Sequence, residues 1–94
     1  MDKKNYWVYI LHCANDTYYT GYTTNVTARY QAHLAGKCKY TRSFKPQSIA
    51  QYFQIGDKSL AMRVEAYIKK LPRVKKLALI AKPELITEVI EELR

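Results

Sequence analysis

Apolar residues dominate the first predicted element of this chain. The run Tyr6–Cys13 is rich in aromatic and β-branched side chains, which is typical of a strand buried on both faces. Residues 14–16 are turn formers, and the segment Thr17–Tyr22 that follows is again rich in Thr and Tyr. The pattern therefore predicts a β-hairpin whose two strands pair antiparallel.

A helix and a third strand are predicted after the hairpin. Asn25 is a favourable N-cap for a helix that continues through Leu34, and Gly36 is the residue type that commonly follows a helix end. The polar, basic segment 37–45 predicts a loop that ends at a proline. Ile49–Ile55 is dominated by Tyr, Phe and Ile, which indicates a strand.

Three helices are predicted in the last part of the chain. The first is capped by Asp57 or Ser59 and ends at Pro72, and its apolar stripe consists of Leu60, Val64, Ile68 and Leu71. The second has its apolar positions at Val74, Leu77 and Ile80. The third opens at Pro83, with Leu85, Ile86, Val89, Ile90 and Leu93 directed inward.

The order of these elements, β-β-α-β-α-α-α, indicates an α+β fold with a small, largely antiparallel sheet. Ninety-four residues make a single domain, 1–94, which at this size buries about 60–65% of the surface of its unfolded chain. Cys13 and Cys38 lie far apart without a CxxC motif, so the sequence predicts two reduced thiols rather than a zinc site or a disulfide. The apolar run after residue 5 is too short for a signal peptide or a membrane span, which favours a cytoplasmic protein.

The charge of the chain is unevenly distributed. The net charge is +8, but residues 1–82 carry +11 whereas the predicted last helix and its flanks, 83–94, carry −3. A sustained positive field favours a polyanionic partner through counterion release and fast association. The alternative interpretation is a solvated surface that keeps the protein soluble. A membrane partner is not favoured, since no basic amphipathic helix with a large apolar face stands out.

Polar residues with chemical potential lie at defined places on this scaffold. Tyr9 and Tyr19 are on adjacent strands and can approach each other on one face, in a register that the sequence does not specify. Arg29 and His33 are four residues apart and share one helix face, while Tyr30 and Leu34 are expected to anchor that helix to the sheet. Glu65, at 100° per residue, falls about 90–100° from the centre of its helix's apolar stripe, at the border between core and solvent.

Glu65 is the sole glutamate before residue 84. A Mg²⁺ ion bound at a phosphodiester commonly uses one or two carboxylates together with waters and substrate phosphate, which makes Glu65 a candidate metal ligand. The competing interpretation is an exposed helix glutamate paired with Lys69 four residues later.

Together these residues resemble the GIY-YIG nucleases. Trp7-Val8-Tyr9 is similar to the first tripeptide of that family and Tyr19-Thr20-Gly21 to the second, and Arg29, His33 and Glu65 follow where the family keeps its remaining site residues. The likeness spans roughly residues 5–81. It is closest to small stand-alone bacterial members of uncharacterised physiological role, which have a stretch similar to Lys39-Tyr40-Thr41-Arg42.

The resemblance implies a three-stranded antiparallel sheet flanked by helices and cleavage of DNA that depends on a divalent ion, Mg²⁺ or Mn²⁺. Three departures stand out. Trp7 and Val8 replace Gly and Ile, Thr20 replaces Ile, and Tyr22 stands where repair-type members carry a lysine. The first two change packing positions, whereas the third removes a cation that would assist deprotonation of a tyrosine.

The resulting hypothesis assigns catalysis to Tyr9, Tyr19, Arg29, His33 and Glu65, with the metal held by Glu65. Arg29 neutralises charge on the phosphate, and Tyr9 takes the proton of the attacking water while Tyr19 and His33 orient it. A phenol with a pKa of about 10 costs about 4 kcal/mol to ionise at pH 7, so His33 is the alternative base.

Substrate contacts are predicted outside this set. Cations alternate with an aromatic residue that could stack on an exposed base in Lys37, Lys39, Tyr40, Arg42 and Lys45, and a second basic cluster comprises Lys69, Lys70, Arg73, Lys75 and Lys76. DNA is favoured over RNA as the partner, with a weak, structure-dependent preference or a partner protein that delivers the substrate.

Two other functions are compatible with the same sequence. One is a non-catalytic nucleic-acid-binding domain that retains the fold, and the other is a basic partner for an acidic protein. The acidic last helix, about 83–93, either completes a small core or packs on a partner or second copy, so the chain is expected to be a monomer or a weak dimer.

Overall fold

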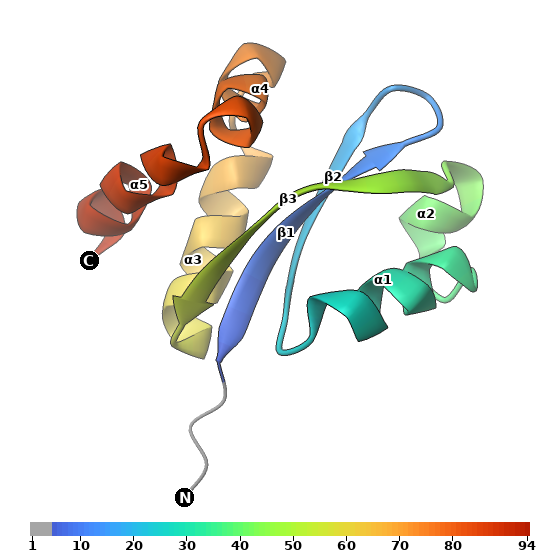
Figure 1. Ribbon diagram of the computed structural model, residues 1–94, viewed down its shortest axis with the longest axis horizontal. Helices are drawn as coiled ribbons and strands as arrows, with labels where there is room; N and C mark the ends of the chain where they lie inside the picture. Colours follow the sequence, from blue (N-terminus) through green and yellow to red (C-terminus); the bar gives the residue numbers. More distant parts are fainter. Residues whose placement is uncertain (1–4) are drawn as a thin grey trace, which may run out of the picture.

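A three-stranded antiparallel sheet separates two groups of helices in this α+β protein (Figure 1). The computed structural model describes residues 5–94. The strands are β1 (Tyr6–Cys13), β2 (Tyr18–Thr23) and β3 (Pro46–Gly56), arranged in the order β2-β1-β3. The apolar run predicted to be the most buried strand is therefore the central one, as expected from its continuous hydrophobicity.

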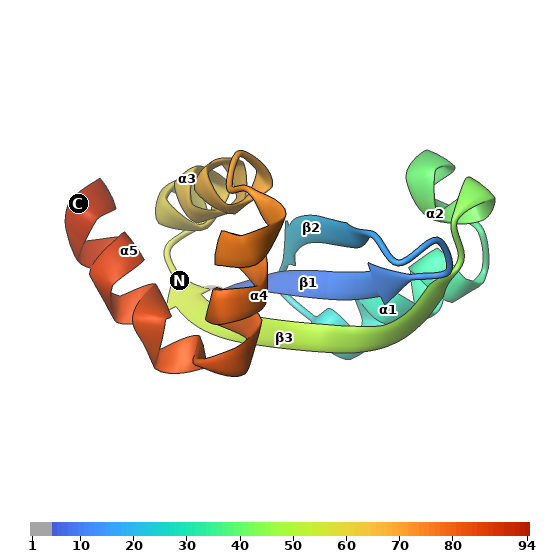
Figure 2. The same ribbon diagram turned by 90° about the horizontal axis from the view of Figure 1, so that it is seen from above.

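The helices lie on both faces of the sheet (Figures 1 and 2). One face carries α1 and the short α2, and the other carries α3, α4, a 3-10 turn η1 and α5. Their bounds are α1 Val26–Leu34, α2 Lys39–Ser43, α3 Lys58–Lys69, α4 Arg73–Ala81, η1 Pro83–Leu85 and α5 Ile86–Leu93.

The alternation of side chains along β1 divides the core into two clusters. Val8 and Ile10 face the larger cluster, which includes the buried side of α3 and is extended by α5. Tyr9, Leu11 and Cys13 point to the other face, where α1 packs. A polar hydroxyl is therefore carried into the interior at Tyr9, on the side of the sheet that α1 covers.

The predicted helix starts are present as capping interactions. The Asn25 side chain accepts a hydrogen bond from the backbone N–H of Ala28 at 3.0 Å, and Asp57, rather than Ser59, caps α3 by accepting from the N–H of Leu60 at 2.9 Å. Gly36 follows α1 with a φ of 78°, a conformation that glycine adopts without strain. Local chemistry thus determines where α1 and α3 begin.

The segment predicted to be a loop, 37–45, contains a helix instead. The five residues of α2 are too few to show a helical apolar period, which is why the pattern did not reveal them. The third strand is also longer than predicted, since it begins at Pro46 rather than Ile49. Proline is tolerated there because β3 is an edge strand and Pro46 is its first residue.

Two predicted apolar faces differ from the observed ones. In α4 the predicted Ile80 packs against the core beside the buried Leu79, whereas Val74 is 70% exposed, because only the end of this helix reaches the core. In α1, Tyr30 packs on the sheet but Leu34 is largely exposed, and His33 occupies the buried position instead. The rotation of α1 about its axis therefore turns a histidine, not a leucine, toward the sheet.

The acidic last helix completes the core. Of the five residues predicted to face inward, Leu85, Ile86, Ile90 and Leu93 pack against the larger cluster, and Val89 is not among the residues that do. Both cysteines are free thiols, also as predicted. No helix within residues 5–94 has the length and apolar character needed to cross a bilayer.

Candidate active site

The Tyr9 side chain crosses the sheet above a glycine. Tyr9 and Gly21 are cross-strand partners in β1 and β2, and a Cβ added to Gly21 would lie only 2.6 Å from Tyr9 Cζ. The tyrosine ring therefore occupies the space that a side chain at position 21 would need. This placement carries the Tyr9 hydroxyl beneath α1, where it lies 2.9 Å from His33 Nε2.

His33 is the centre of a buried polar network. The histidine is 1% exposed, and its Nδ1 lies 2.9 Å from the hydroxyl of Thr41, itself 1% exposed, on α2. The Thr41 hydroxyl donates to the Cys38 carbonyl at 3.3 Å, and Cys38 Sγ lies 3.9 Å from His33 Nε2. Sequence reasoning did not select Thr41 or Cys38, because both became site residues only through the fold of the unpredicted α2.

Tyr19 lies beside this network on the same face of the sheet. It pairs with Leu11, two positions along β2 from Gly21, so its ring lies diagonally across from Tyr9 with the centroids 6.5 Å apart. Its ring is 5.1 Å from that of His33 and 5.5 Å from that of Tyr40 on α2. The register that the sequence left open thus brings the two tyrosines together.

Glu65 approaches the cluster from α3. Its side chain is 20% exposed, at the border between core and solvent, and its carboxylate lies 3.7 Å from Lys69 Nζ. That ammonium also lies 5.9 Å from the centre of the Tyr19 ring. The predicted pairing with Lys69 is therefore present, but it occurs at the edge of the tyrosine cluster rather than on a remote surface.

Burial and one cation govern the electrostatics of the site. Burial raises the pKa of Tyr9 to about 12, against the opposing effect of hydrogen bonding by the exposed Arg29, and the same contact raises the pKa of Arg29. Burial and then Arg29 lower the pKa of His33. The pKa of Tyr19 is raised, first by burial and then by nearby Cys38, and also by Glu65. At neutral pH the cluster therefore contains a neutral histidine, two phenols and a permanent cation.

The donor set around Glu65 fits one kind of metal. Within residues 5–94 no three His, Cys, Asp or Glu side chains gather as a ligand group, which excludes a site built only from such side chains. Mg²⁺ and Mn²⁺ accept oxygen ligands, and Mg²⁺ commonly keeps several waters beside one or two carboxylates and a substrate phosphate. The solvent-accessible Glu65 carboxylate beside a phenol suits such an ion.

The predicted substrate-binding residues fall into two groups. The Tyr40 ring contacts those of Tyr19 and Phe44 in tilted arrangements, and its hydroxyl lies 2.8 Å from that of Thr17. The exposed cations on this side, beside or within α2, are Lys37, Lys39, Arg42 and Lys45. On the other side, Lys69 contacts the site directly, while Lys70 is exposed just beyond the end of α3.

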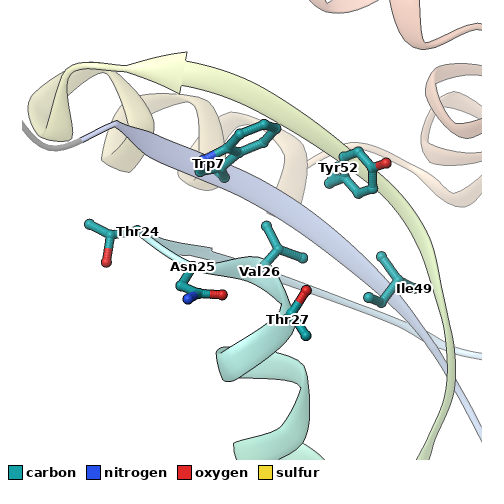
Figure 3. A pocket seen from close by; sticks show the side chains of 7 residues that line it. All are labelled: Trp7, Thr24, Asn25, Val26, Thr27, Ile49 and Tyr52. Carbon is teal, nitrogen blue, oxygen red and sulfur yellow. The ribbon is translucent and has the colours of Figure 1, made fainter.

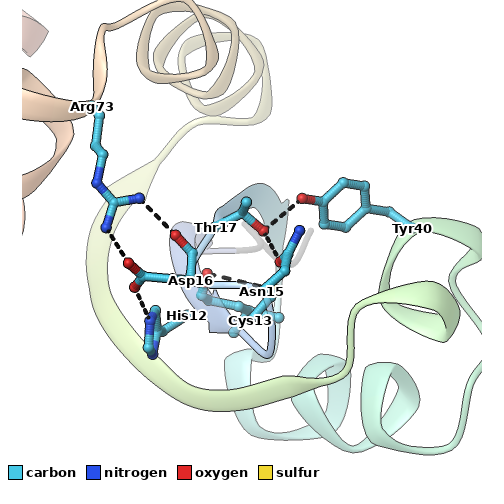
Figure 4. Close-up of polar contacts among 8 residues, drawn as sticks. His12, Cys13, Asn15, Asp16, Thr17, Tyr40 and Arg73 are labelled. Carbon is cyan, nitrogen blue, oxygen red and sulfur yellow. Dashed lines mark hydrogen bonds and ion pairs between the residues drawn. The ribbon is translucent and has the colours of Figure 1, made fainter.

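Arg73 has a different environment from the one predicted for it. Its guanidinium donates to the Asp16 backbone carbonyl at 2.6 Å and to the Asp16 carboxylate at 2.8 Å (Figure 4). The same guanidinium lies over the ring of Tyr18. The hydrogen bond from His12, and then the charge of Arg73, lower the pKa of Asp16. Arg73 therefore fastens the β1–β2 turn to α4, since Asp16 presents both oxygens at a positive φ of 59°.

One cavity lies apart from the tyrosine cluster. It has a volume of about 350 Å³ and is lined by Trp7, Thr24, Asn25, Val26, Thr27, Ile49 and Tyr52 (Figure 3). Trp7 and Tyr52 form an edge-to-face pair with centroids 5.9 Å apart. None of the five predicted catalytic residues lines it.

Known proteins share the sequence of this chain over most of its length. A family model described as the GIY-YIG catalytic domain matches residues 5–78. A UPF0213 protein from Natronomonas pharaonis is 46% identical over 78 residues, which cover 82% of this chain and 92% of that relative. A UPF0213 protein from Oceanobacillus iheyensis is 47% identical over 81 residues, covering 85% and 93%.

A solved structure is similar as well. The solution NMR structure of a UPF0213 protein from Bacillus halodurans is 42% identical in sequence and superimposes with a TM-score of 0.54. The match covers 82% of this chain and 83% of that one. It agrees with the three-stranded architecture described above.

Proposed function

Because this chain belongs to the GIY-YIG catalytic-domain family, we propose that it is a divalent-metal-dependent endonuclease that hydrolyses DNA phosphodiesters. The observation that carries the proposal is the convergence of Tyr9, Tyr19 and His33 on one face of the sheet, with Arg29 and Glu65 close beside them. These five side chains come from four different elements, so local sequence alone does not bring them together.

Tyr9 and His33 act as one base in this proposal. A Tyr9 pKa of about 12 means that a free phenolate costs about 7 kcal/mol at pH 7. The cost falls if Tyr9 passes its proton to His33 Nε2, 2.9 Å away, while it takes the proton of the attacking water. The Tyr9 hydroxyl lies beside the exposed Arg29, which binds the substrate, whereas His33 lies behind it in contact with Thr41, so the water meets Tyr9 first.

Arg29 binds the scissile phosphate. Its guanidinium is exposed, remains charged at all relevant pH values and lies beside the Tyr9 hydroxyl. A planar fork of N–H donors suits the non-bridging oxygens, on which negative charge grows in the transition state. The same cation favours transient phenolate at Tyr9, so one residue serves both substrate and base.

Glu65 would hold the divalent ion, Mg²⁺ or Mn²⁺. When bound there, the ion supplies Lewis-acid polarisation of the phosphate and stabilisation of the leaving oxygen. Lys69 lies beside both Glu65 and Tyr19, a position from which its ammonium can contact a neighbouring phosphate. Tyr19 bounds the site opposite Tyr9 and orients the water or the substrate.

The substrate strand is proposed to pass over Tyr19 and Tyr40. The cations beside α2 neutralise backbone phosphates, and Tyr40, which is 38% exposed, offers a ring face to an unpaired base. These contacts carry no sequence code. The preference among DNA structures is therefore weak, or a partner protein supplies it, and DNA is favoured over RNA.

The test is cleavage of nicked, branched and single-stranded DNA and of RNA, with Mg²⁺ or Mn²⁺ and then with EDTA. We expect metal-dependent cleavage of DNA that falls about 10²- to 10³-fold in Arg29→Ala and is lost in Glu65→Gln. The controls are Arg63→Ala, an exposed arginine about 200° around α3 from Glu65, and Glu88→Gln on α5. Binding without cleavage of any substrate would instead establish the non-catalytic nucleic-acid-binding domain.

A further inference from the structure

Three protons must be distributed along the buried network of Tyr9, His33 and Thr41. The two hydroxyls and the neutral imidazole each contribute one. The acceptors within reach are His33 Nε2 or Nδ1, whichever lacks a proton, the two hydroxyl oxygens and the Cys38 carbonyl. Because both ring contacts are 2.9 Å and all three side chains are about 1% exposed, each proton needs a partner inside the protein.

One arrangement satisfies every proton. If Nδ1 of His33 is protonated, it donates to the Thr41 oxygen, and the Thr41 hydroxyl donates to the Cys38 carbonyl. Nε2 then carries a lone pair and accepts the Tyr9 proton. The Cys38 thiol, 3.9 Å from Nε2, is a weak donor directed at the same lone pair.

The opposite tautomer leaves the Tyr9 proton without an acceptor. If Nε2 were protonated, it would donate to the Tyr9 oxygen, and Thr41 would donate to Nδ1. Within residues 5–94, the structure gives the Tyr9 hydroxyl no hydrogen-bond partner that can then accept, since Arg29 is a donor only. A buried donor left unsatisfied costs roughly as much as a lost hydrogen bond.

We propose that Thr41 is a positioning residue that holds His33 in the Nδ1–H tautomer, so that Nε2 is the atom that receives the Tyr9 proton. The role of Thr41 in proton transfer rests on the proposed function, whereas the tautomer of His33 does not. In the reaction, the Tyr9 O–H bond breaks as the Nε2–H bond forms. The water proton replaces the lost one on Tyr9, and the resulting imidazolium still donates from Nδ1 to Thr41.

The position of Thr41 explains why a residue outside the tyrosine motifs is needed. Cys38 is the N-cap of α2, and Thr41 follows it by three residues. One turn of the helix therefore brings the Thr41 hydroxyl to the Cys38 carbonyl. Burial and Arg29 lower the pKa of His33, which keeps the ring neutral at pH 7. A neutral ring carries one proton, on either Nδ1 or Nε2, so its tautomer decides which nitrogen can accept the Tyr9 proton.

The decisive measurement is the tautomer of His33 in the folded wild-type protein. Long-range ¹H–¹⁵N spectra of the ring-labelled protein at pH 7.5 distinguish a protonated from an unprotonated ring nitrogen, and a His12→Gln variant assigns the two histidines. We expect a protonated Nδ1 and an unprotonated Nε2. A protonated Nε2, or an even mixture of the two forms, overturns the proposal whatever the activity of the protein.

Substitutions at Thr41 separate the hydroxyl from the shape of the side chain. Thr41→Val should shift the population of His33 toward Nε2–H and lower kcat about tenfold or more with little change in KM, since it weakens only the proton transfer. Thr41→Ser should restore both. Thr20→Val is the matched control at another buried threonine. A Thr41→Val protein with an unchanged tautomer and kcat contradicts the proposal, and one that fails to fold leaves the wild-type spectrum to decide.

The two proposals fail in different ways. If His33 has the Nδ1–H tautomer but no nucleic acid is cleaved, the positioning inference stands and the nuclease proposal falls. If cleavage depends on Tyr9 and Arg29 while Nε2 is protonated, the nuclease activity stands, but the transfer of the Tyr9 proton to Nε2 and the role of Thr41 are both rejected.

Discussion

Gly21 makes room for the ring of Tyr9. The two residues are direct cross-strand partners, and the tyrosine side chain lies where a β-carbon on residue 21 would point. The second tripeptide of the sequence thus contributes through the absence of a side chain as well as through its tyrosine. Without this gap the Tyr9 hydroxyl could not reach His33 across the face of β2.

Gly21→Ala should therefore displace the Tyr9 ring. Because the new Cβ would approach Tyr9 Cζ to 2.6 Å in a buried region, we expect a loss of about 1–3 kcal/mol in the free energy of unfolding, measured in urea. Cleavage should fall with it, since the Tyr9–His33 hydrogen bond is broken.

A double-mutant cycle checks the cause. In a Tyr9→Leu background the ring is gone, so Gly21→Ala should cost much less than in the wild type. Equal costs in the two backgrounds would mean that Gly21 is needed for some other reason.

The stability of the protein should decline as the pH falls below about 6.5. The pKa of His33 is lowered in the folded protein, so the unfolded chain binds the proton first, and folding loses free energy between the unfolded value and the lower folded one. Thermal unfolding measured from pH 7.5 to pH 5 should show this decline in the wild type and in His12→Gln, but not in His33→Gln. A wild-type melting temperature that stays constant over this range would contradict it.

Thr20→Val should stabilise the protein. The Thr20 hydroxyl is buried and has no hydrogen-bond partner in the described part of the chain, so removing it relieves a desolvation cost at nearly constant volume. The expected gain is about 1 kcal/mol in urea unfolding. Thr41→Val is the informative contrast, because it deletes a hydroxyl that is hydrogen-bonded and should destabilise.

Tyr40→Leu should weaken binding to single-stranded DNA more than Phe44→Leu does. The two rings are similarly exposed and in contact, but only Tyr40 lies against Tyr19 at the site. Loss of one base-stacking platform costs about 1–3 kcal/mol of binding free energy, measurable by fluorescence anisotropy. Equal losses in both variants would place the bases elsewhere on α2.

Arg73 and Lys70 should respond differently to alanine substitution. Lys70→Ala should reduce the slope of log affinity against log salt by about 1, as expected for one lost phosphate contact. Arg73→Ala should leave the slope unchanged and lower stability modestly, because its guanidinium is engaged by Asp16 in an exposed pair. A reduced slope in Arg73→Ala would show that Arg73 contacts phosphate and belongs to the nucleic-acid-binding surface.

The elements with strong local signals were predictable. The buried strand Tyr6–Cys13 has its predicted bounds, and α1 and α3 begin at predicted caps. A strand buried on both faces requires a run of apolar residues, and an N-cap requires a particular residue type, so both can be recognised in the sequence. The helix α2 and the buried face of α4 were not predictable. Five residues are too few for a period, and the part of a helix that meets the core depends on where its neighbours lie.

The same division applies to the site. The sequence by itself determined which residue types are available, Tyr9, Tyr19, Arg29, His33 and Glu65, since their order and spacing are properties of the chain. Only the tertiary structure decided the register that sets Tyr9 over Gly21, the rotation of α1 that buries His33, and the delivery of Thr41 by α2. These features depend on contacts between residues distant in sequence. The packing energy of such contacts is shared by the whole core, so no single segment of the sequence determines them.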